Sequence, residues 1–311
     1  MKNIFKISQI GIGGNAFGYY LDQNDTNKVL YKSLDLNIKK IDTSDTYSNG
    51  NSERFIGRTL YDNNLRNKFI IFSKCGLKSY ENASNKFSKK KIENKFFSSL
   101  KRLKTDYLDY YAIHNYDKST PIEEILSTLQ SLSNRGYLLN YGFSNVNINQ
   151  YLYIQRLKKY YINLNYFQIL HNLFNRENEV ILSKSKINKD NIITYGSLLR
   201  GILTGKYLDK DLDISKTRFN NSLKLREHLS EKMYVFLQEY EQLCNIFDIK
   251  MTHASIYYSI YSYSKSVLIG FRDSNQLNNL SIGFNKKVDE LFFYKLKNLL
   301  KLYGNLKINY F

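Results

Sequence analysis

Short apolar runs alternate along the chain with longer stretches in which apolar residues recur every three to four positions. The short runs are typical of buried strands, and the longer stretches are typical of helices with one apolar face. The pattern predicts eight strands, at residues 7–12, 38–42, 69–74, 108–114, 139–144, 166–169, 191–195 and 266–270. It predicts helices in the gaps, at residues 26–36, 52–60, 89–103, 122–135, 148–160, 229–247 and 252–263, with a weak one near residue 179.

The regular alternation of strand and helix indicates the fold class. Parallel neighbouring strands need crossover connections, which helices supply. Eight strands joined in this way close naturally into a (β/α)8 barrel of the TIM type, so we predict an α/β fold. No Pro- or Ser-rich linker marks a boundary, so residues 1–311 are expected to form a single domain. An open, doubly wound sheet is the alternative fold.

Two regions add detail to the predicted barrel. Thr120, Pro121 and Glu123 predict a helix start, with Thr120 as the cap, Pro121 at the first helical position and Glu123 completing a capping box. The gap before the last strand is longer than the others and is expected to hold an extended loop, 201–224, followed by two helices. Extra helices are thus expected before and after the last strand. Long loops on barrels tend to be functional.

The composition suits a globular protein, but its charge is unusual. Hydrophobic residues make up 42% of the chain and charged residues 24%, while the formal net charge is +18. A basic balance suits nucleic acids, membranes or small anions. The lysines are scattered, and only 89–91 form a run, so we expect neither a nucleic-acid partner nor a membrane. Two cysteines cannot form a disulfide framework, and no apolar run reaches membrane-spanning length, so a cytoplasmic location is expected.

Polar residues capable of chemistry follow the predicted strands. Strand 38–42 ends in Asp42, with Tyr47 in the following loop, strand 69–74 ends in Lys74, and strand 108–114 ends in His114. The carboxyl ends of barrel strands face one shared site. A nearby ammonium lowers the pKa of a phenol and makes it a better acid, a carboxylate holds that ammonium, and a histidine orients a carbonyl. This set suits protonation of an oxyanion as hydride arrives.

Each of these residues also has a purely structural explanation. A strand-end aspartate is often a helix cap, one tyrosine among 28 is usually a packing residue, and a buried histidine is usually a satisfied core residue. Lys74 is harder to explain, because an unpaired buried ammonium is costly. The coincidence of four complementary groups at three successive strand ends favours catalysis over packing.

Seven segments resemble the motifs of the aldo-keto reductase family, in family order. The segment IDTSDTYSNGNSERFIGRTL at 41–60 is similar to the signature D-T-A-x-x-Y-G-x-G-x-S-E. The others are FSKCG at 72–76, DYLDYYAIHNYD at 106–117, GYLLNYGFSN at 136–145, FQILHNLFNR at 167–176, YGSLLRGILTGKY at 195–207 and LIGFRDSNQL at 268–277. The resemblance covers residues 5–285 and implies a barrel that transfers hydride between a nicotinamide cofactor and a carbonyl.

The resemblance also implies a role for individual residues. Tyr47 is the general acid, Lys74 tunes its acidity, Asp42 pairs with Lys74, and His114 directs the carbonyl. The cofactor is expected to contact Ser144, Asn145 and Gln168 through its carboxamide, Tyr195 through its ring, Gly196 and Leu198 of the same motif, and Arg272 and Gln276 through its adenosine end. Arg272 favours NADPH over NADH, because a guanidinium suits a phosphate. No metal site is expected.

Some departures from the family pattern bear on the expected site. Ser48 stands where glycine usually follows the tyrosine, His171 where a tyrosine is common, and Ser197 where proline is usual. Ser48 puts the backbone conformation there in doubt, and His171 puts the shape of the nicotinamide pocket in doubt.

The resemblance favours a reductase acting on an aldehyde, a ketone or a sugar-derived carbonyl. The same chemistry run in reverse gives a dehydrogenase of a sugar or secondary alcohol, and a non-catalytic cofactor-sensing subunit is a third interpretation. The tetrad argues against the last, because a binding module has no use for Tyr47 beside Lys74. Substrate identity, direction of reaction and oligomeric state are left open by the sequence.

Overall fold

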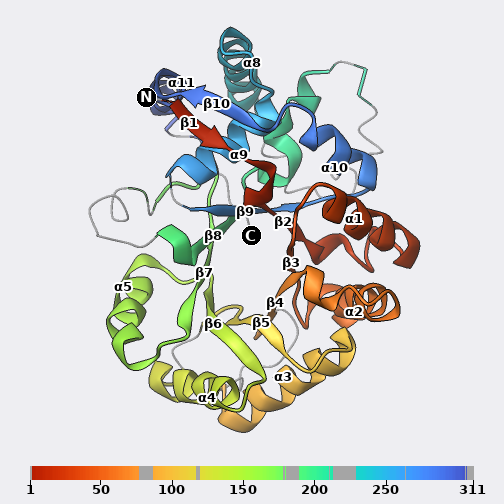
Figure 1. The fold of residues 1–311 in the computed structure, drawn as a ribbon. Helices are drawn as coiled ribbons and strands as arrows, with labels where there is room; N and C mark the ends of the chain where they lie inside the picture. Colours follow the sequence, from red (N-terminus) through yellow and green to blue (C-terminus); the bar gives the residue numbers. More distant parts are fainter. Residues whose placement is uncertain are drawn as a thin grey trace.

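The computed structural model describes residues 2–76, 87–116, 120–177, 179, 189–209, 211–212, 229–262, 264–304 and 306. Eight parallel strands close into a barrel, with helices around it (Figure 1), which confirms the predicted (β/α)8 fold. The strands are β2 (Ile10–Gly13), β3 (Lys40–Asp42), β4 (Ile70–Cys75), β5 (Leu108–Ile113), β6 (Leu138–Ser144), β7 (Leu164–Leu170), β8 (Ile192–Tyr195) and β9 (Ser266–Gly270). The pairing of β2 with β9, Ile12 opposite Ile269, closes the barrel.

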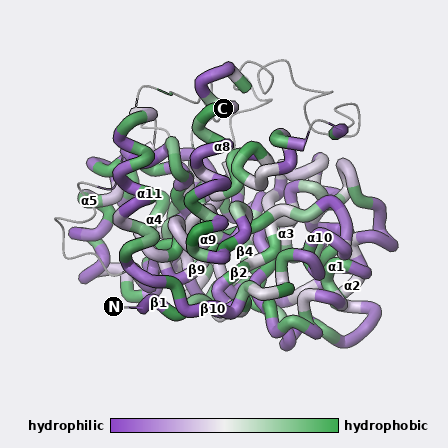
Figure 2. The backbone as a smooth tube through the Cα atoms, turned by 90° about the horizontal axis from the view of Figure 1, so that it is seen from above, coloured by the Kyte–Doolittle hydropathy of each residue, from purple (hydrophilic) through white to green (hydrophobic). Residues whose placement is uncertain are grey.

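The helices lie outside the barrel and cover it. They are α1 (Gln23–Asp35), α2 (Asn51–Asp62), α3 (Lys89–Leu103), α4 (Ile122–Asn134), α5 (Ile148–Leu157), α8 (Glu231–Ile246), α9 (Met251–Ser262), α10 (Ser274–Ser281) and α11 (Glu290–Leu302). Hydrophobic and hydrophilic residues alternate along helices such as α8 (Figure 2), as expected where one face packs inward. No helix in the described part of the chain is long and apolar enough to cross a bilayer.

Most predicted elements agree with the structure to within a few residues. Most of the predicted helix near residue 179 and most of the predicted loop 201–224 lie outside the described residues. The described start of that loop contains the end of one 3₁₀ helix, η7 (Leu199–Thr204), and a second, η8 (Lys206–Leu208). The extra helices expected on both sides of the last strand are α8 and α9 before it, and α10 and α11 after it.

The start of the first predicted strand was wrong, and two strands were missed. Residues 7–9 form a 3₁₀ turn, and only from Ile10 does the chain join the barrel. Before that turn, β1 (Lys2–Phe5) pairs antiparallel with β10 (Lys286–Asp289). Each of these short strands has a single buried residue, Phe5 and Val288, so neither produces an apolar run. Figures 1 and 2 place the pair at one end of the barrel.

The predicted capping box at the start of α4 was also wrong. Pro121 is itself the N-cap, with extended backbone, and no side chain caps the helix. The Thr120 hydroxyl instead accepts a hydrogen bond from the backbone N–H of Phe87 at 2.8 Å. Glu123 accepts from the Tyr153 hydroxyl on α5. Thr120 and Glu123, which the local pattern assigned to the helix end, are therefore hydrogen-bonded to residues distant in sequence instead.

Buried apolar residues form two separate groups. The larger lies between the strands and the surrounding helices. The smaller joins residues from five strands, Phe72, Ala112, Tyr166, Ile193 and Leu268. Within the smaller group the Phe72 ring stacks on Tyr110, with centroids 4.3 Å apart, and Tyr166 packs 5.1 Å from Phe72. These large rings fill the barrel interior beneath the strand ends, as side-chain layers do in barrels of this type.

Gly142 allows β6 and β7 to approach each other at the point where their register shifts. The shift falls between Tyr141 and Gly142. A Cβ at residue 142 would lie 1.7 Å from the carbonyl oxygen of Tyr166. Only a glycine therefore permits this backbone approach, and it sets the position of the Ser144 end of β6.

Replacing Gly142 with alanine should destabilise the barrel, because β7 has to move away from the new methyl group. Overpacking of this kind costs about 1–3 kcal/mol or more. Urea unfolding followed by circular dichroism measures the loss. The control is Gly304→Ala, where the nearest atom would be 3.5 Å away, and it should leave stability nearly unchanged. Equal stability of G142A and the parent protein would contradict the argument.

Candidate active site

Four side chains predicted to act together come from three neighbouring strands. Asp42 is the last residue of β3, Lys74 lies near the end of β4, and His114 directly follows β5. Tyr47 begins the short 3₁₀ helix η3 (Tyr47–Gly50), which follows β3. Because β3, β4 and β5 are adjacent and parallel, their carboxyl ends bring these residues to the same end of the barrel.

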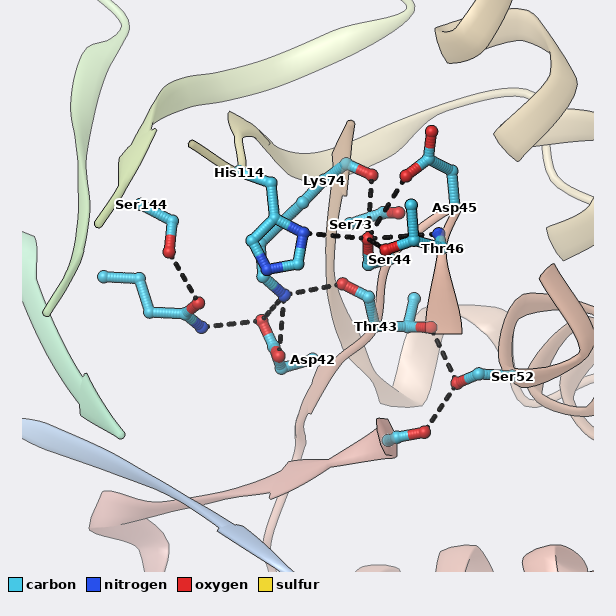
Figure 3. A network of polar contacts seen from close by, with 12 residues as sticks. Asp42, Thr43, Ser44, Asp45, Thr46, Ser52, Ser73, Lys74, His114 and Ser144 are labelled. Atoms are coloured by element: carbon cyan, nitrogen blue, oxygen red, sulfur yellow. Dashed lines mark hydrogen bonds and ion pairs between the residues drawn. The ribbon is translucent and has the colours of Figure 1, made fainter. Parts of the chain in front are cut away.

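Lys74 and Asp42 form a buried, bidentate ion pair (Figure 3). The Lys74 Nζ lies 2.7 Å and 2.8 Å from the two carboxylate oxygens of Asp42. It also donates to the backbone carbonyl of Thr43 at 2.7 Å. Gln168 donates its amide N–H to Asp42 Oδ1 at 2.8 Å. The ammonium therefore has three acceptors, and the carboxylate has a second donor beyond the lysine.

Burial and charge act in opposite directions on this pair. Burial raises the pKa of the Asp42 carboxyl, and the Lys74 ammonium opposes that rise. Burial also lowers the pKa of the Lys74 ammonium, and Asp42 opposes that change. Each charge is therefore held in a water-poor position by the other, as a buried ion pair requires.

The Tyr47 ring packs close to both the Lys74 ammonium and the His114 ring. Its centroid is 5.0 Å from Lys74 Nζ and 5.7 Å from the centroid of the His114 ring. The two residues that follow, Ser48 and Asn49, have left-handed backbone with φ of 50° and 54°. Ser48 thus adopts a conformation that favours glycine, the residue usual at this position, so the loop turns sharply after Tyr47.

His114 is neutral at ordinary pH. Burial lowers the pKa of its imidazole well below 6.5, and the nearby Lys74 ammonium lowers it further. Its Nδ1 lies 3.1 Å from the hydroxyl oxygen of Ser44. A neutral imidazole has one N–H donor and one acceptor nitrogen, so the histidine is able to hydrogen-bond a carbonyl oxygen without carrying charge.

A second tyrosine, Tyr166 on β7, approaches Asp42 from inside the barrel, and no local pattern predicted its presence in the site. Burial raises the pKa of the Tyr166 phenol well above 10, and the charge of Asp42 raises it further. Tyr166 is almost completely buried, whereas Tyr47 lines an open cavity. Of these two phenols, Tyr47 is the one within reach of a substrate.

A cavity of about 570 Å³ extends from Tyr47 across the carboxyl end of the barrel to α10. Predicted site residues on its wall are Asp42, Tyr47, His114, Asn145, Gln168, Tyr195, Gly196, Leu198, Arg272 and Gln276. Lys74 and Ser144 lie behind this wall, and both are fully buried. Ser144 donates to Gln168 Oε1 at 3.1 Å, so it supports a wall residue.

The cavity has a flat aromatic wall and fixed amide groups close to Tyr47. Asn145 has left-handed backbone with φ of 56° and donates to the carbonyl of His114 at 2.9 Å. It accepts a hydrogen bond from the Tyr195 hydroxyl. The ring of Tyr195 and the amide of Asn145 are thus held in a fixed mutual position. Gln168 is fixed between Asp42 and Ser144.

The opposite end of the cavity is strongly basic. Arg200, Lys206, Lys250 and Arg272 line it, and among the described residues of the wall Asp42 is the only acid. The Arg272 guanidinium lies 4.8 Å from the centroid of the Tyr20 ring. Gln276 accepts from the backbone N–H of Arg272 at 3.0 Å. Because Asp42 is already paired with Lys74, this set of cations fits a ligand that carries several negative charges.

The model of the Aldo/keto reductase family matches residues 9–300. The chain belongs to the aldo/keto reductase family. Its members are oxidoreductases, and the resemblance noted from the motifs is thereby confirmed.

Three relatives are informative. The aldo-keto reductase YhdN of Bacillus subtilis (strain 168) is 33% identical over 209 residues, which is 65% of this chain and 62% of YhdN, less than two thirds of either. The uncharacterized oxidoreductase YqkF of the same organism is 27% identical over 280 residues, 87% of this chain and 85% of YqkF. Among solved structures, a glycerol dehydrogenase from Gluconobacter oxydans has a TM-score of 0.79 at 26% identity, covering 96% of this chain and 93% of its own.

Several residues of this aldo/keto reductase site were not predicted individually. Arg200, Lys206 and Lys250 were missed as cavity residues, because the chain has 46 basic residues and a basic side chain by itself does not mark the site. Arg200 and Lys206 do fall inside the matched motif at 195–207, which was the available signal. Glu53, in the matched motif at 41–60, is buried, pairs with Arg102 at 2.6 Å and accepts from Ser73, on the side of β4 that faces the helices.

His171 does not line the cavity of this aldo/keto reductase. Its ring is buried, lies 3.0 Å from Glu179 through Nε2, and stacks on Tyr258 of α9. Its backbone N–H donates to the carbonyl of Tyr195 at 3.0 Å. His171 therefore stands behind the strand that carries Tyr195. Among the described residues, no group of three or more His, Cys, Asp or Glu side chains is placed to hold a metal ion.

Replacing Lys74 with methionine should make stability depend on pH in a definite direction. Asp42 loses the ammonium that opposes the effect of burial, so its folded-state pKa rises further above 3.8. A carboxyl with a raised folded-state pKa holds its proton in the folded protein, so the free energy of unfolding of K74M should fall as pH rises from about 4. Near neutral pH the loss should reach about 3–5 kcal/mol, the usual result of breaking a buried ion pair.

Urea unfolding at about pH 5 and about pH 8 tests this expectation. The matched control is the double variant D42N/K74M, which has no buried charge at this position and should lack the additional fall. Stability of K74M that stays constant or rises over this interval would contradict the assignment.

Proposed function

We propose that this aldo/keto reductase uses NADPH to reduce an aldehyde or ketone, with Tyr47 as the general acid. The observation that supports the proposal best is the position of Tyr47 and His114 on one cavity wall, next to the buried Asp42–Lys74 ion pair. We further propose that residues 1–311 form one catalytic domain and that the protein works in the cytoplasm.

The side chains around Tyr47 have different roles in the protonation of the substrate. Tyr47 and His114 would receive a substrate carbonyl oxygen at the cavity wall, and a nicotinamide, when bound, would supply the hydride. The positive charge of Lys74 favours the phenolate and so helps Tyr47 release its proton to the developing alkoxide. His114 remains neutral, because burial and Lys74 lower its pKa, and it orients the carbonyl by a hydrogen bond. Asp42 keeps the ammonium in position.

The other cavity residues are proposed to hold the cofactor. Tyr195, Gly196 and Leu198 would hold the nicotinamide ring, and Asn145 and Gln168, which Ser144 supports, would hydrogen-bond its carboxamide. The basic residues of the cavity would hold the phosphates. Arg272 and Gln276 hold the adenosine end, and the guanidinium, stacked on Tyr20, favours a 2′-phosphate and hence NADPH over NADH.

Oxidation of a sugar or secondary alcohol is the second candidate. The similarity to a glycerol dehydrogenase supports it, and the same residues serve both directions, with Tyr47 accepting the proton in oxidation. A panel of aldehydes, ketones, sugars and polyols, assayed with NADPH and NADP⁺ in the two directions, distinguishes the candidates. Cofactor binding without turnover of any compound would favour a cofactor-sensing subunit instead.

Replacing Tyr47 with phenylalanine should abolish turnover while cofactor affinity stays nearly constant. The variant removes one hydroxyl and keeps the ring that packs beside Lys74 and His114. The loss of a general acid costs about a hundredfold or more in rate. Steady-state turnover and fluorescence titration with NADPH measure the two effects. Retention of more than about a tenth of the parent rate, a change of about 1.4 kcal/mol in the barrier, would assign the acid role to another group.

Replacing Arg272 with alanine should change cofactor preference. Loss of a charge-assisted hydrogen bond to a phosphate costs about 1–3 kcal/mol, so affinity for NADPH should fall while affinity for NADH hardly changes. Fluorescence titration with each nucleotide measures the difference. The variant Tyr20→Leu, which removes only the ring beneath the guanidinium, should give a smaller change in the same direction. Equal losses for the two nucleotides would rule out 2′-phosphate recognition by Arg272.

A further inference from the structure

Ser44 occupies a position in the site that the catalytic roles above leave unused. It lies between Thr43 and Asp45 in the loop after β3, and its side chain is fully buried. In the family signature D-T-A-x-x-Y the corresponding residue is alanine, so the hydroxyl is an addition in this chain. Its oxygen lies 3.1 Å from His114 Nδ1, as Figure 3 shows.

The surroundings of the Ser44 hydroxyl decide which way its proton points. The backbone N–H of Thr46 donates to Ser44 Oγ at 3.3 Å. The Thr46 hydroxyl, 3.1 Å away, is able to donate to the same oxygen. These two donors occupy the lone pairs of the serine oxygen, so its own proton is available for an acceptor.

Besides the Thr46 hydroxyl, three acceptors lie within reach of that proton, and two of them have other donors. Asp45 Oδ1 is 3.3 Å from Ser44 Oγ, and the carboxylate has a second donor, because Lys95 pairs with its other oxygen, Oδ2, at 3.1 Å. The carbonyl of Lys74 is also 3.3 Å away, but it accepts the backbone N–H of Asp45 at 3.1 Å. His114 Nδ1 is the nearest of the three. The network therefore runs from Thr46 through Ser44 to the imidazole.

A neutral histidine carries its proton on one nitrogen only, and the partner of the other nitrogen selects which. If Nδ1 accepts, Nε2 carries the proton and serves as a donor. If Nδ1 donates to Ser44 instead, Nε2 becomes an acceptor and has no proton for a carbonyl oxygen. The two nitrogens point in nearly opposite directions, and Nδ1 faces Ser44, so Nε2 is the nitrogen available on the cavity side.

We propose that Ser44 is a positioning residue that donates its hydroxyl proton to His114 Nδ1 and thereby holds the imidazole with its proton on Nε2, ready to bind a substrate carbonyl. Only one part of this proposal rests on the proposed function, namely that the Nε2 proton binds a substrate carbonyl. The state of the histidine is a property of the protein alone, and it is measurable whether or not any substrate is known.

Nitrogen-15 spectroscopy of protein labelled at its four histidines tests the tautomer directly. Loss of a resonance pair in His114→Gln assigns the signals. In the parent protein we expect Nδ1 to be unprotonated, with the shift of a hydrogen-bonded acceptor, and Nε2 to carry the proton. In Ser44→Ala the Nδ1 resonance should move toward that of an acceptor with no hydrogen bond, and in Ser44→Thr it should stay close to the parent value.

The matched control is Ser52→Ala, which removes another fully buried hydroxyl from the same region. Ser52 contacts Thr43 and the carbonyl of Gly14, at 2.8 Å each, and the described structure gives it no contact with His114. Its removal should leave the His114 resonances unchanged. A protonated Nδ1 in the parent protein, or an Nδ1 resonance that does not respond to Ser44→Ala, would overturn the proposal.

Kinetics give a second readout that a merely structural role would not reproduce. Ser44→Ala should lower kcat about three- to tenfold, the effect of one neutral hydrogen bond, with NADPH affinity unchanged. Ser44→Thr should restore most of the rate. Failure of the parent protein to turn over any carbonyl would reject the proposed function but leave the spectroscopic result standing. A normal rate in Ser44→Ala together with the expected shift change would overturn the catalytic use of the tautomer.

Discussion

The buried ion pair between Lys74 and Asp42 is the constraint on which the rest of the site depends. Two charges placed in the barrel interior lose their hydration, and only close geometry and further hydrogen bonds offset that cost. Here the ammonium contacts both carboxylate oxygens and the Thr43 carbonyl, and Gln168 donates to the carboxylate. The loop after β3, the end of β4 and the end of β7 must therefore all be in place at once.

The strand register makes this pair possible. Asp42 pairs with Phe72 in the ladder between β3 and β4. Side chains two residues apart in a strand share a face, so Lys74 points to the same side as Phe72, into the barrel. Phe72 belongs to the interior aromatic group below. The large rings exclude water beneath the ion pair and the cavity lies above it, which leaves the charges to act on Tyr47 and His114.

Sequence reasoning found the elements whose physical signals are local. The barrel strands are apolar runs, and the tetrad follows from strand ends together with the family motifs. It missed β1 and β10, because one buried residue each leaves no periodic signal. It misassigned Thr120 and Glu123, because contacts with Phe87 and Tyr153, distant in sequence, outweighed the local cap. Tyr166 and Lys250 enter the site only through tertiary packing, and no local pattern separates them from other tyrosines and lysines.

The net charge of the chain and the individual cations of the cavity act on anions in different ways. A net charge of +18 spread over the chain attracts anions of every kind, and salt screens that attraction beyond about 10 Å. Lys74 contributes little to such a field, because Asp42 neutralises it at contact distance, so its influence is confined to close neighbours such as Tyr47. At the other end, Arg272 rests against Tyr20 and beside Gln276, in an orientation fixed before any ligand arrives. Selectivity among anions therefore depends on such fixed groups, and the total charge affects mainly how often anions approach.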